Sequence, residues 1–296
     1  MRIVLRAPRD DDLPQLAEQL GLDRLVEVVA PLDPARDARV AEVGGRLVGS
    51  CWVRVVSSVT VFSADGSEAY CSGHVAPEHR RRGVGSALLA WAVQRARATP
   101  GVREAFTVVG ARDAVPLLAS FGFRHAKTAY LMTHPAPAAV PQPTWPEGIR
   151  AVTSLRADEL VDAVAAACDR AFEDVAGYRG ANRSRVARLL AHPTTDPALC
   201  LVAMRGGEVV GLNYCRLERH GDAAQGWVED LGVARPARRV GLGRALLWQG
   251  VRELARRGAG SVLLGVDAAN APARRLYEQT GFTRSEEISQ HRLVLG

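Results

Sequence analysis

Apolar and polar positions alternate along several short stretches of the chain, and this period of two predicts β-strands. The stretches are residues 3–6, 70–75 and 104–109 in the first half, and residues 149–152, 225–233 and 261–266 in the second half. Apolar positions at helical spacing behind acidic caps predict amphipathic helices near residues 11–20 and 156–171. Gly44-Gly45 and Gly206-Gly207 predict the turns of two β-hairpins. Mixed strands and helices around one sheet indicate an α/β or α+β fold.

The order of these predicted elements occurs twice, and so do several short motifs. Residues 74–89 (HVAPEHRRRGVGSALL) return as residues 232–247 (GVARPARRVGLGRALL). Upstream, GRLVG at 45–49 returns as GEVVG at 207–211, and downstream Gly122-Phe123 returns as Gly281-Phe282. All three pairs share nearly the same offset, so the two halves have one architecture. Each half is expected to continue with a long helix, a strand, a second helix and a last hairpin-like stretch.

A proline-rich segment separates the two copies. Residues 134–148 contain five prolines, which exclude a helix and favour an extended, semi-rigid linker. The sequence therefore predicts an N-terminal domain over residues 1–134, a linker over 135–148 and a C-terminal domain over 149–296.

Composition and charge exclude several classes of function. The 296 residues are 47% hydrophobic and 24% charged, with no apolar run long enough for a membrane helix and no signal-peptide pattern. The net charge of +6 comes from arginines interspersed with acids, and aromatic residues make up only 5%, which disfavours nucleic-acid binding. Five scattered cysteines, without CxxC or HExxH patterns, indicate neither disulfides nor a metal site. We expect a bacterial cytoplasmic enzyme.

The motif Arg-x-x-Gly-x-Gly, between a strand and a helix in each half, predicts an anion site. Its copies are residues 80–85 and 238–243. Glycines at the start of a helix let backbone N–H groups approach a phosphate closely, and the helix dipole favours negative charge there. Arginines oppose that dipole, so their presence indicates that a pyrophosphate neutralises them. The motif for a P-loop is absent, and no acidic residue stands at the spacing of a Rossmann site.

These motifs resemble those of the GNAT acyltransferase superfamily. The resemblance covers both halves, but only the second half adds Asn270-Ala-Pro-Ala-Arg-Arg-Leu-Tyr277 before Gly281-Phe282. It implies two tandem GNAT-like domains, each with a splayed mixed sheet that holds the pantetheine arm of acetyl-CoA. In the second half it implies that the Val233 amide polarises the thioester carbonyl, as an oxyanion donor would. The cofactor-binding residues implied there are Leu231, Val233, Arg238, Arg239, Val240, Gly241, Leu242, Gly243, Arg244, Ala245 and Asn270.

The same resemblance implies the groups that move protons. Tyr277 corresponds to the tyrosine that protonates the CoA sulfur, and Glu229 to a glutamate that takes the proton from the amine. Strand alternation places Glu229, Leu231 and Val233 on one face and Asp230 on the other. Another branch of the family carries its glutamate two residues earlier, where this chain has Trp227. A packing tyrosine and a charge at a strand edge are the alternative interpretations.

The first half departs from this pattern at the proton-handling positions. A linear count places Leu118 at the tyrosine position, Ala111 at the asparagine position and Cys71 at the glutamate position. We therefore expect the first half to be degenerate, and either to bind CoA weakly or to have a structural role. The residues that would bind CoA there are Val75, Arg80, Arg81, Arg82, Gly83, Val84, Gly85 and Ser86.

Together these features predict an acetyl-CoA-dependent N-acetyltransferase acting on a primary amine of a small molecule, as a monomer or homodimer. Among two-domain relatives the arrangement resembles mycothiol synthase, which acetylates a cysteinyl amine, although Trp227 counts against that identification. An amino sugar and a protein amine are other possible acceptors. A non-catalytic CoA-sensing protein is the alternative from another class, and the pairing of Tyr277 with Glu229 favours an enzyme over it.

Overall fold

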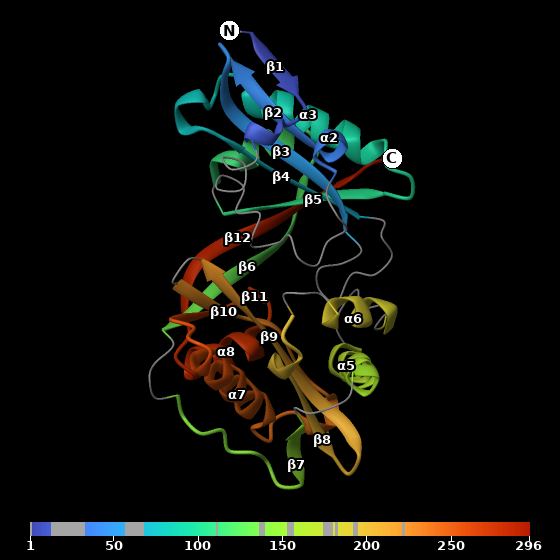
Figure 1. Cartoon of the computed structure of the whole chain (residues 1–296), viewed down its shortest axis with the longest axis vertical. Coiled ribbons are helices and arrows are strands. Elements are labelled where there is room, and N and C mark those ends of the chain that lie inside the picture. Colours follow the sequence, from blue (N-terminus) through green and yellow to red (C-terminus); the bar gives the residue numbers. More distant parts are fainter. Residues whose placement is uncertain are drawn as a thin grey trace. The chain divides into compact units, whose positions relative to one another are not determined.

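The alternating stretches form strands where the sequence predicts them. The computed structural model describes residues 2–12, 33–56, 68–110, 112–135, 140–152, 157–173, 180, 183–191, 195–220 and 223–296. The predicted helix near residues 11–20 lies mostly outside these residues. In the first half (Figure 1) the strands and helices are β1 (Ile3–Arg6), α2 (Pro34–Asp37), β2 (Ala38–Val43), β3 (Arg46–Val56), β4 (Glu68–Val75), α3 (Val84–Arg97), β5 (Glu104–Val109), α4 (Val115–Ser120) and β6 (Arg124–Pro135).

The second half repeats this order from residue 149 onwards. Its elements are β7 (Ile149–Val152), α5 (Ala157–Phe172), α6 (Arg183–Leu190), β8 (Cys200–Arg205), β9 (Glu208–His220), β10 (Ala223–Val233), α7 (Leu242–Arg256), β11 (Ser261–Asp267), α8 (Ala271–Gln279) and β12 (Thr283–Val294). The hairpins at Gly44-Gly45 and Gly206-Gly207 and the helix near residues 156–171 are confirmed. The prediction of a hairpin-like stretch at the end of each half is wrong, because each of these stretches is one long strand, β6 or β12.

These two long strands are exchanged between the halves. Of the described residues, one compact unit holds the chain up to Lys127 together with residues 288–296, and the other holds residues 128–287. In the first unit the strand order is β1-β2-β3-β4-β5-β12, and in the second it is β6-β11-β10-β9-β8-β7. Thus β12 pairs with β5 although more than a hundred residues separate them, and β6 pairs with β11 in the same way. Each unit completes its sheet with a strand from the other half of the sequence.

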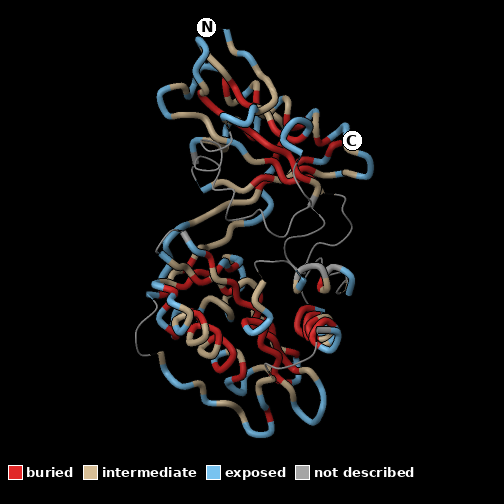
Figure 2. Tube along the Cα trace, viewed as in Figure 1, coloured by how far each residue is buried: buried red, intermediate tan, exposed pale blue. Residues whose placement is uncertain are grey.

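Helices cover the sheet of the second unit on both faces. On one face α5 and α6 pack over Val202, Leu212 and Tyr214. On the other face α7 and α8 bury Leu247, Val251 and Tyr277, among others (Figure 2). In the first unit α3 packs over β3 and β4 in a corresponding core. The amphipathic pattern of each helix therefore faces a sheet, and burial of this apolar surface drives the packing.

Each sheet has one pair of adjacent parallel strands, and the two strands of that pair diverge. In the second unit β10 pairs with β11 only from Gln225 to Val228, and β10 then continues to Val233 paired with β9 alone. In the first unit β4 pairs with β5 only from Glu68 to Tyr70. Beyond these points the facing edges of the two strands no longer pair with each other, so their backbone N–H and C=O groups can pair with another partner. Both glycine motifs follow directly after the diverging strands.

Candidate active site

The glycine motifs form two equivalent backbone cradles, one before α3 and one before α7. Gly83 and Gly241 cap these helices with φ angles of 86° and 92°. Arg81 and Arg239, with φ of 58° and 65°, are the residues other than glycine that have positive φ in the described part of the chain. That conformation costs a non-glycine residue roughly 1–2 kcal/mol. A left-handed residue two positions before a left-handed glycine turns successive N–H groups to one side, as in anion-binding nests.

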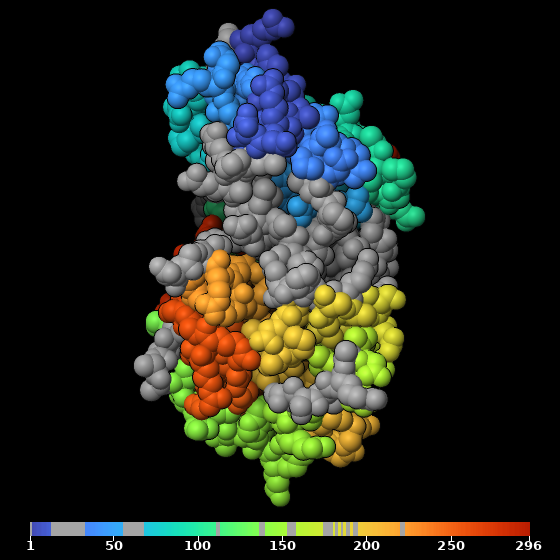
Figure 3. Space-filling view, viewed as in Figure 1, coloured from blue at the N-terminus to red at the C-terminus, as the bar shows by residue number. Residues whose placement is uncertain are grey.

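The motif of the second unit lies at the molecular surface. Val240 is 52% exposed, and Arg239 and Gly241 beside it are exposed too. The colour bar of Figure 3 gives this part of the chain an orange colour, and orange atoms are visible on the face that the space-filling view shows. Nothing lies within 4 Å of the position that a Cβ would take on Gly241. The positive φ, and not a lack of space, is therefore what requires glycine at position 241. The cradle is open to a ligand.

Four polar residues predicted to bind the cofactor have partners within the protein. Arg238 donates from Nε to the Val233 carbonyl at 3.0 Å and from Nη2 to the Ala171 carbonyl at 3.0 Å. Arg80 repeats the first contact in the other unit, to the Val75 carbonyl at 3.1 Å. This arginine thus fixes the end of the diverging strand.

The remaining two contacts involve α8. Arg244 donates to Gln279 at 2.9 Å, which joins the start of α7 to the end of α8. Asn270 caps α8, because its side-chain oxygen accepts from the Ala273 amide at 3.1 Å. This cap sets where the helix carrying Tyr277 begins.

Tyr277 lies on α8 in the core of the second unit. Its side chain packs beside Phe282, and the residue is 7% exposed. Burial, with a smaller contribution from the Asp230 carboxylate, raises the pKa of Tyr277 to about 12. The phenol therefore stays protonated throughout the physiological pH range. Leu231, on the part of β10 that has separated from β11, packs against the core cluster that contains Tyr277.

A β-bulge on β10 changes the face on which Glu229 lies. Val228 pairs with Cys215 and Asp230 with Tyr214, so Glu229 is an extra residue in the ladder. Its carboxylate contacts Arg216, on the face covered by α5, where Tyr214 also packs. Leu231 and Val233 face the α7 side instead. The predicted alternation is therefore wrong for Glu229, because a bulge shifts the strand by one residue and turns the side chain over.

The face of Glu229 carries charged residues that the sequence analysis missed. Arg216 is buried and donates from Nε to Glu229 Oε1 at 2.9 Å. It also contacts Glu218, whose Oε2 accepts from Trp227 Nε1 at 3.0 Å. One signal was present in the sequence: an arginine stands five residues after the last glycine of the repeated GRLVG and GEVVG motifs, Arg54 after Gly49 and Arg216 after Gly211.

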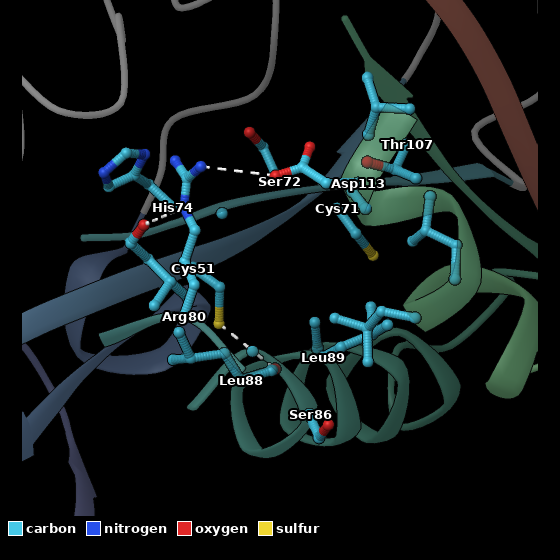
Figure 4. Close-up of a pocket in the computed structure, with 18 of the residues that line it drawn as sticks. Cys51, Cys71, Ser72, His74, Arg80, Ser86, Leu88, Leu89, Thr107 and Asp113 are labelled. Carbon is cyan, nitrogen blue, oxygen red and sulfur yellow. Dashed lines mark hydrogen bonds and ion pairs between the residues drawn. The ribbon is translucent and has the colours of Figure 1, made fainter. Parts of the chain in front are cut away.

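The first unit contains a cavity of about 840 Å³ between β4, β5, α3 and α4. Cys51, Cys71 and Thr107 line it from the sheet, and Leu88 and Leu89 line it from α3 (Figure 4). The cradle residues Arg80, Arg81, Gly83, Gly85 and Ser86 line its mouth. Arg80 also approaches Asp113 at 3.4 Å. The cavity therefore joins the anion cradle to the gap between the diverging strands.

The register of the two units confirms one predicted equivalence and corrects another. Leu118 and Tyr277 are equivalent, since their carbonyls accept from Phe123 at 3.1 Å and from Phe282 at 3.0 Å. Cys71, however, pairs with Val53, as Val228 pairs with Cys215. Cys71 is therefore the counterpart of Val228, and β4 has no residue that corresponds to the bulged Glu229. Ala111 lies outside the described residues.

Two other properties of the described residues bear on the chemistry. No helix among them is long and apolar enough to span a membrane. Within the same residues, no cluster of histidine, cysteine and carboxylate side chains has the arrangement of a metal site. The five cysteines are reduced and buried, and burial raises the pKa of Cys71 to about 12, so this thiol is protonated and unreactive at neutral pH.

Comparison with known proteins places these features in a family. The sequence matches the Acetyltransferase (GNAT) family over residues 10–123 and again over residues 163–282. The mycothiol acetyltransferase of Thermobispora bispora is 35% identical over 217 residues, which cover 71% of each protein. The mycothiol acetyltransferase of a Nocardioides species is 31% identical over 294 residues, which cover 94% of this chain and 95% of that protein.

Solved structures show the same fold across the whole chain. A GCN5-related N-acetyltransferase from Sphaerobacter thermophilus superposes with a TM-score of 0.78 at 24% identity, covering 99% of this chain and 96% of its own. A tandem GNAT protein from the clavulanic acid biosynthesis pathway superposes with a TM-score of 0.70 at 19% identity, covering 100% and 99%. The repeated motifs, the diverging strands and these matches agree: the chain belongs to the GNAT family of acetyltransferases and is an N-acetyltransferase with two GNAT domains in tandem.

Proposed function

We propose that the second unit transfers the acetyl group of acetyl-CoA to a primary amine of a small molecule, with Glu229 as the base and Tyr277 as the acid. The observation that carries this proposal is that the second unit has both a carboxylate at the bulge of its diverging strand β10 and a buried phenol on α8, in a core cluster against which Leu231 of β10 packs. The first unit has the cradle and the diverging strands, but Leu118 stands where Tyr277 would be.

The residues of the second unit fit acetyl-CoA. The left-handed Arg239 and Gly241 form an open cradle at the N-terminus of α7, which suits a pyrophosphate. The backbone of Leu231 and Val233 lies beyond the point where β10 leaves β11, which suits an amide-bearing arm. Arg239, Val240, Gly241, Leu242, Gly243, Arg244 and Ala245 would hold the phosphates, and Leu231 and Val233 the arm. Acetyl-CoA supplies the acetyl group as an activated thioester.

The surroundings of Glu229 and Tyr277 suit the roles proposed for them. Oε1 of Glu229 accepts from the Arg216 guanidinium, and the Glu229 side chain is 29% exposed. It can therefore take a proton from an amine that reaches this face. Tyr277, with its pKa raised to about 12, keeps its proton at neutral pH and so has one to donate to the sulfur as the carbon–sulfur bond breaks. The proposed base is thus partly exposed beside a guanidinium, whereas the proposed acid is buried.

We further propose that the first unit binds a CoA-type ligand without catalysing transfer. Its cavity of about 840 Å³ connects the cradle of Arg81 and Gly83 with the diverging β4 and β5. The cavity wall contains Leu118 in place of a phenol, and β4 has no bulged carboxylate. Binding is therefore retained while both proton-handling groups are missing.

A second candidate for the acceptor is the cysteinyl amine that becomes acetylated in mycothiol. The names of the relatives described above favour it. Trp227 is the feature that argues against it. A protein with this acceptor would release CoA with a cysteinyl glycoside and show little turnover with amino sugars or polyamines.

The test is a measurement of CoA release with a panel of amines. The purified chain would be incubated with acetyl-CoA and with polyamines, amino sugars or cysteine-bearing glycosides, and the free thiol measured. We expect at least one amine to be acetylated, and Glu229→Gln and Tyr277→Phe to lower its turnover while acetyl-CoA still binds. Turnover that survives both substitutions would refute the assignment of acid and base.

A further inference from the structure

A chain of hydrogen bonds runs from Trp227 to Glu229 across the face of β9 and β10 that α5 covers. Trp227 Nε1 donates to Glu218 Oε2 at 3.0 Å. Glu218 Oε1 accepts from Arg216 Nη1. Arg216 then donates from Nε at 2.9 Å to Glu229, and its Nη2 lies 2.8 Å from the same carboxylate. The order Trp227, Glu218, Arg216, Glu229 defines what we call the relay.

The middle of the relay is buried and its end is accessible. The side chains of Arg216 and Glu218 are 7% and 6% exposed, whereas that of Glu229 is 29% exposed. Burial by itself lowers the pKa of Arg216, but the two carboxylates outweigh this effect and raise it, so the guanidinium stays charged. A buried guanidinium held between two carboxylates has little rotational freedom, because any other position would leave charges unpaired.

The contacts fix the orientation of the Glu229 carboxylate. Both contacts from Arg216 go to Oε1. Among the described residues, none donates to Oε2. Within the described part of the chain the carboxylate is therefore held by Oε1 alone, which leaves Oε2 to accept a proton from a ligand. Free rotation of a glutamate would otherwise spread its two oxygens over several rotamers.

The first unit supplies an internal comparison, because it has kept only part of this arrangement. Arg54 occupies the place of Arg216, since it pairs with Tyr70 as Arg216 pairs with Trp227. Val56 stands where the second unit has Glu218, and β4 has no bulge residue. The unit that lacks the relay carboxylates is the one that also lacks the phenol of Tyr277.

We propose that Trp227, Glu218 and Arg216 are positioning residues that aim Oε2 of Glu229 at the acceptor amine. In this arrangement the indole N–H of Trp227 fixes Glu218, which fixes Arg216. Arg216 in turn orients the carboxylate of Glu229 at the bulge. The inference rests on the proposed role of Glu229 as the base.

The test is a double-mutant cycle on turnover. Trp227→Phe keeps an aromatic side chain but removes the N–H donor and one ring, so it loosens the relay, and the matched control must lose the same volume. We expect a fall of roughly tenfold in kcat with unchanged affinity for acetyl-CoA, which is within the loss that a misplaced catalytic group causes. In a Glu229→Gln background the same change should have no further effect on kcat, because no base is left to position. Trp52→Phe, a buried indole of the first unit, is the matched control.

Two further variants separate positioning from general damage. Arg216→Lys retains a charge beside Glu229 and should recover part of the turnover that Arg216→Met loses. Urea unfolding curves would show that each variant is folded. If Trp227→Phe lowered kcat equally in both backgrounds, the relay would be refuted while the base assignment survived. If Glu229→Gln had no effect on turnover, the base assignment itself would fail, and the relay with it.

Discussion

Replacement of Tyr277 by phenylalanine tests the proposed acid most directly. The side chain is almost fully buried beside Phe282, so loss of one hydroxyl leaves the packing unchanged. The pKa of Tyr277 is raised to about 12 by burial, so at pH 8 only about one molecule in ten thousand has an ionised phenol. Because the phenol keeps its proton at this pH, it can act as a proton donor and not as a base. Its removal should lower kcat at least tenfold, since general acids contribute about 10²–10⁴-fold.

The same pKa shift predicts a difference in stability at alkaline pH. Ionisation of Tyr277 is harder in the folded protein than in the unfolded chain, so the wild type loses stability as pH rises from about 10 to about 12. The rise in the pKa of Tyr277 from the ordinary value of 10.0 to about 12 corresponds to a loss of at most about 3 kcal/mol in the free energy of unfolding. Tyr277→Phe cannot ionise there and should escape this loss. At pH 7 the two proteins should have equal stability.

The assays are CoA release for turnover, calorimetry for acetyl-CoA affinity and urea unfolding at pH 7 and near pH 11. Tyr70→Phe is the matched control, because burial also raises the pKa of Tyr70, in the first unit. It should change alkaline stability without changing turnover. Full turnover of Tyr277→Phe would remove the phenol from the mechanism. A tenfold loss of acetyl-CoA affinity instead of kcat would make Tyr277 a binding residue.

Three further predictions follow from the site. Glu229→Gln should lower kcat/KM for the amine about 100-fold, with unchanged calorimetric affinity for acetyl-CoA; equal loss of both would contradict its role as base. Gly241→Ala forces a side chain to adopt a φ of 92° and should weaken acetyl-CoA binding and turnover together, whereas Gly83→Ala should remove a binding event in calorimetry and leave turnover intact. Asn270→Ala removes the cap of α8 and should lower the free energy of unfolding by about 1 kcal/mol, measured in urea, with a larger effect on kcat than on acetyl-CoA affinity.

Much of the architecture follows from local sequence. The repeated motif placed Gly83 and Gly241 at the N-termini of two helices, and both are helix caps with positive φ. Alternation predicted the strands that precede them. Such features depend on residues close together in the chain, whose steric and hydrogen-bonding preferences act in any tertiary context.

The exchange of strands could not be predicted in this way. Both β6 and β12 have the same pattern of burial, with exposed residues first and partly buried ones after. The pattern shows that each is a strand but not which partner it pairs with. Partner choice depends on packing between segments more than a hundred residues apart, so the order of elements along the chain does not determine it.

The sequence by itself determined the tandem repeat, the family and the identity of Glu229 and Tyr277 as candidates. Only the tertiary structure decided which face Glu229 occupies and what holds it. A bulge adds one residue to a strand without disturbing the alternation of buried and partly buried positions along β10. Its effect is visible only against the neighbouring strand, where Arg216 meets the carboxylate. A register shift is a relation between two strands, and the pattern of one strand does not contain it.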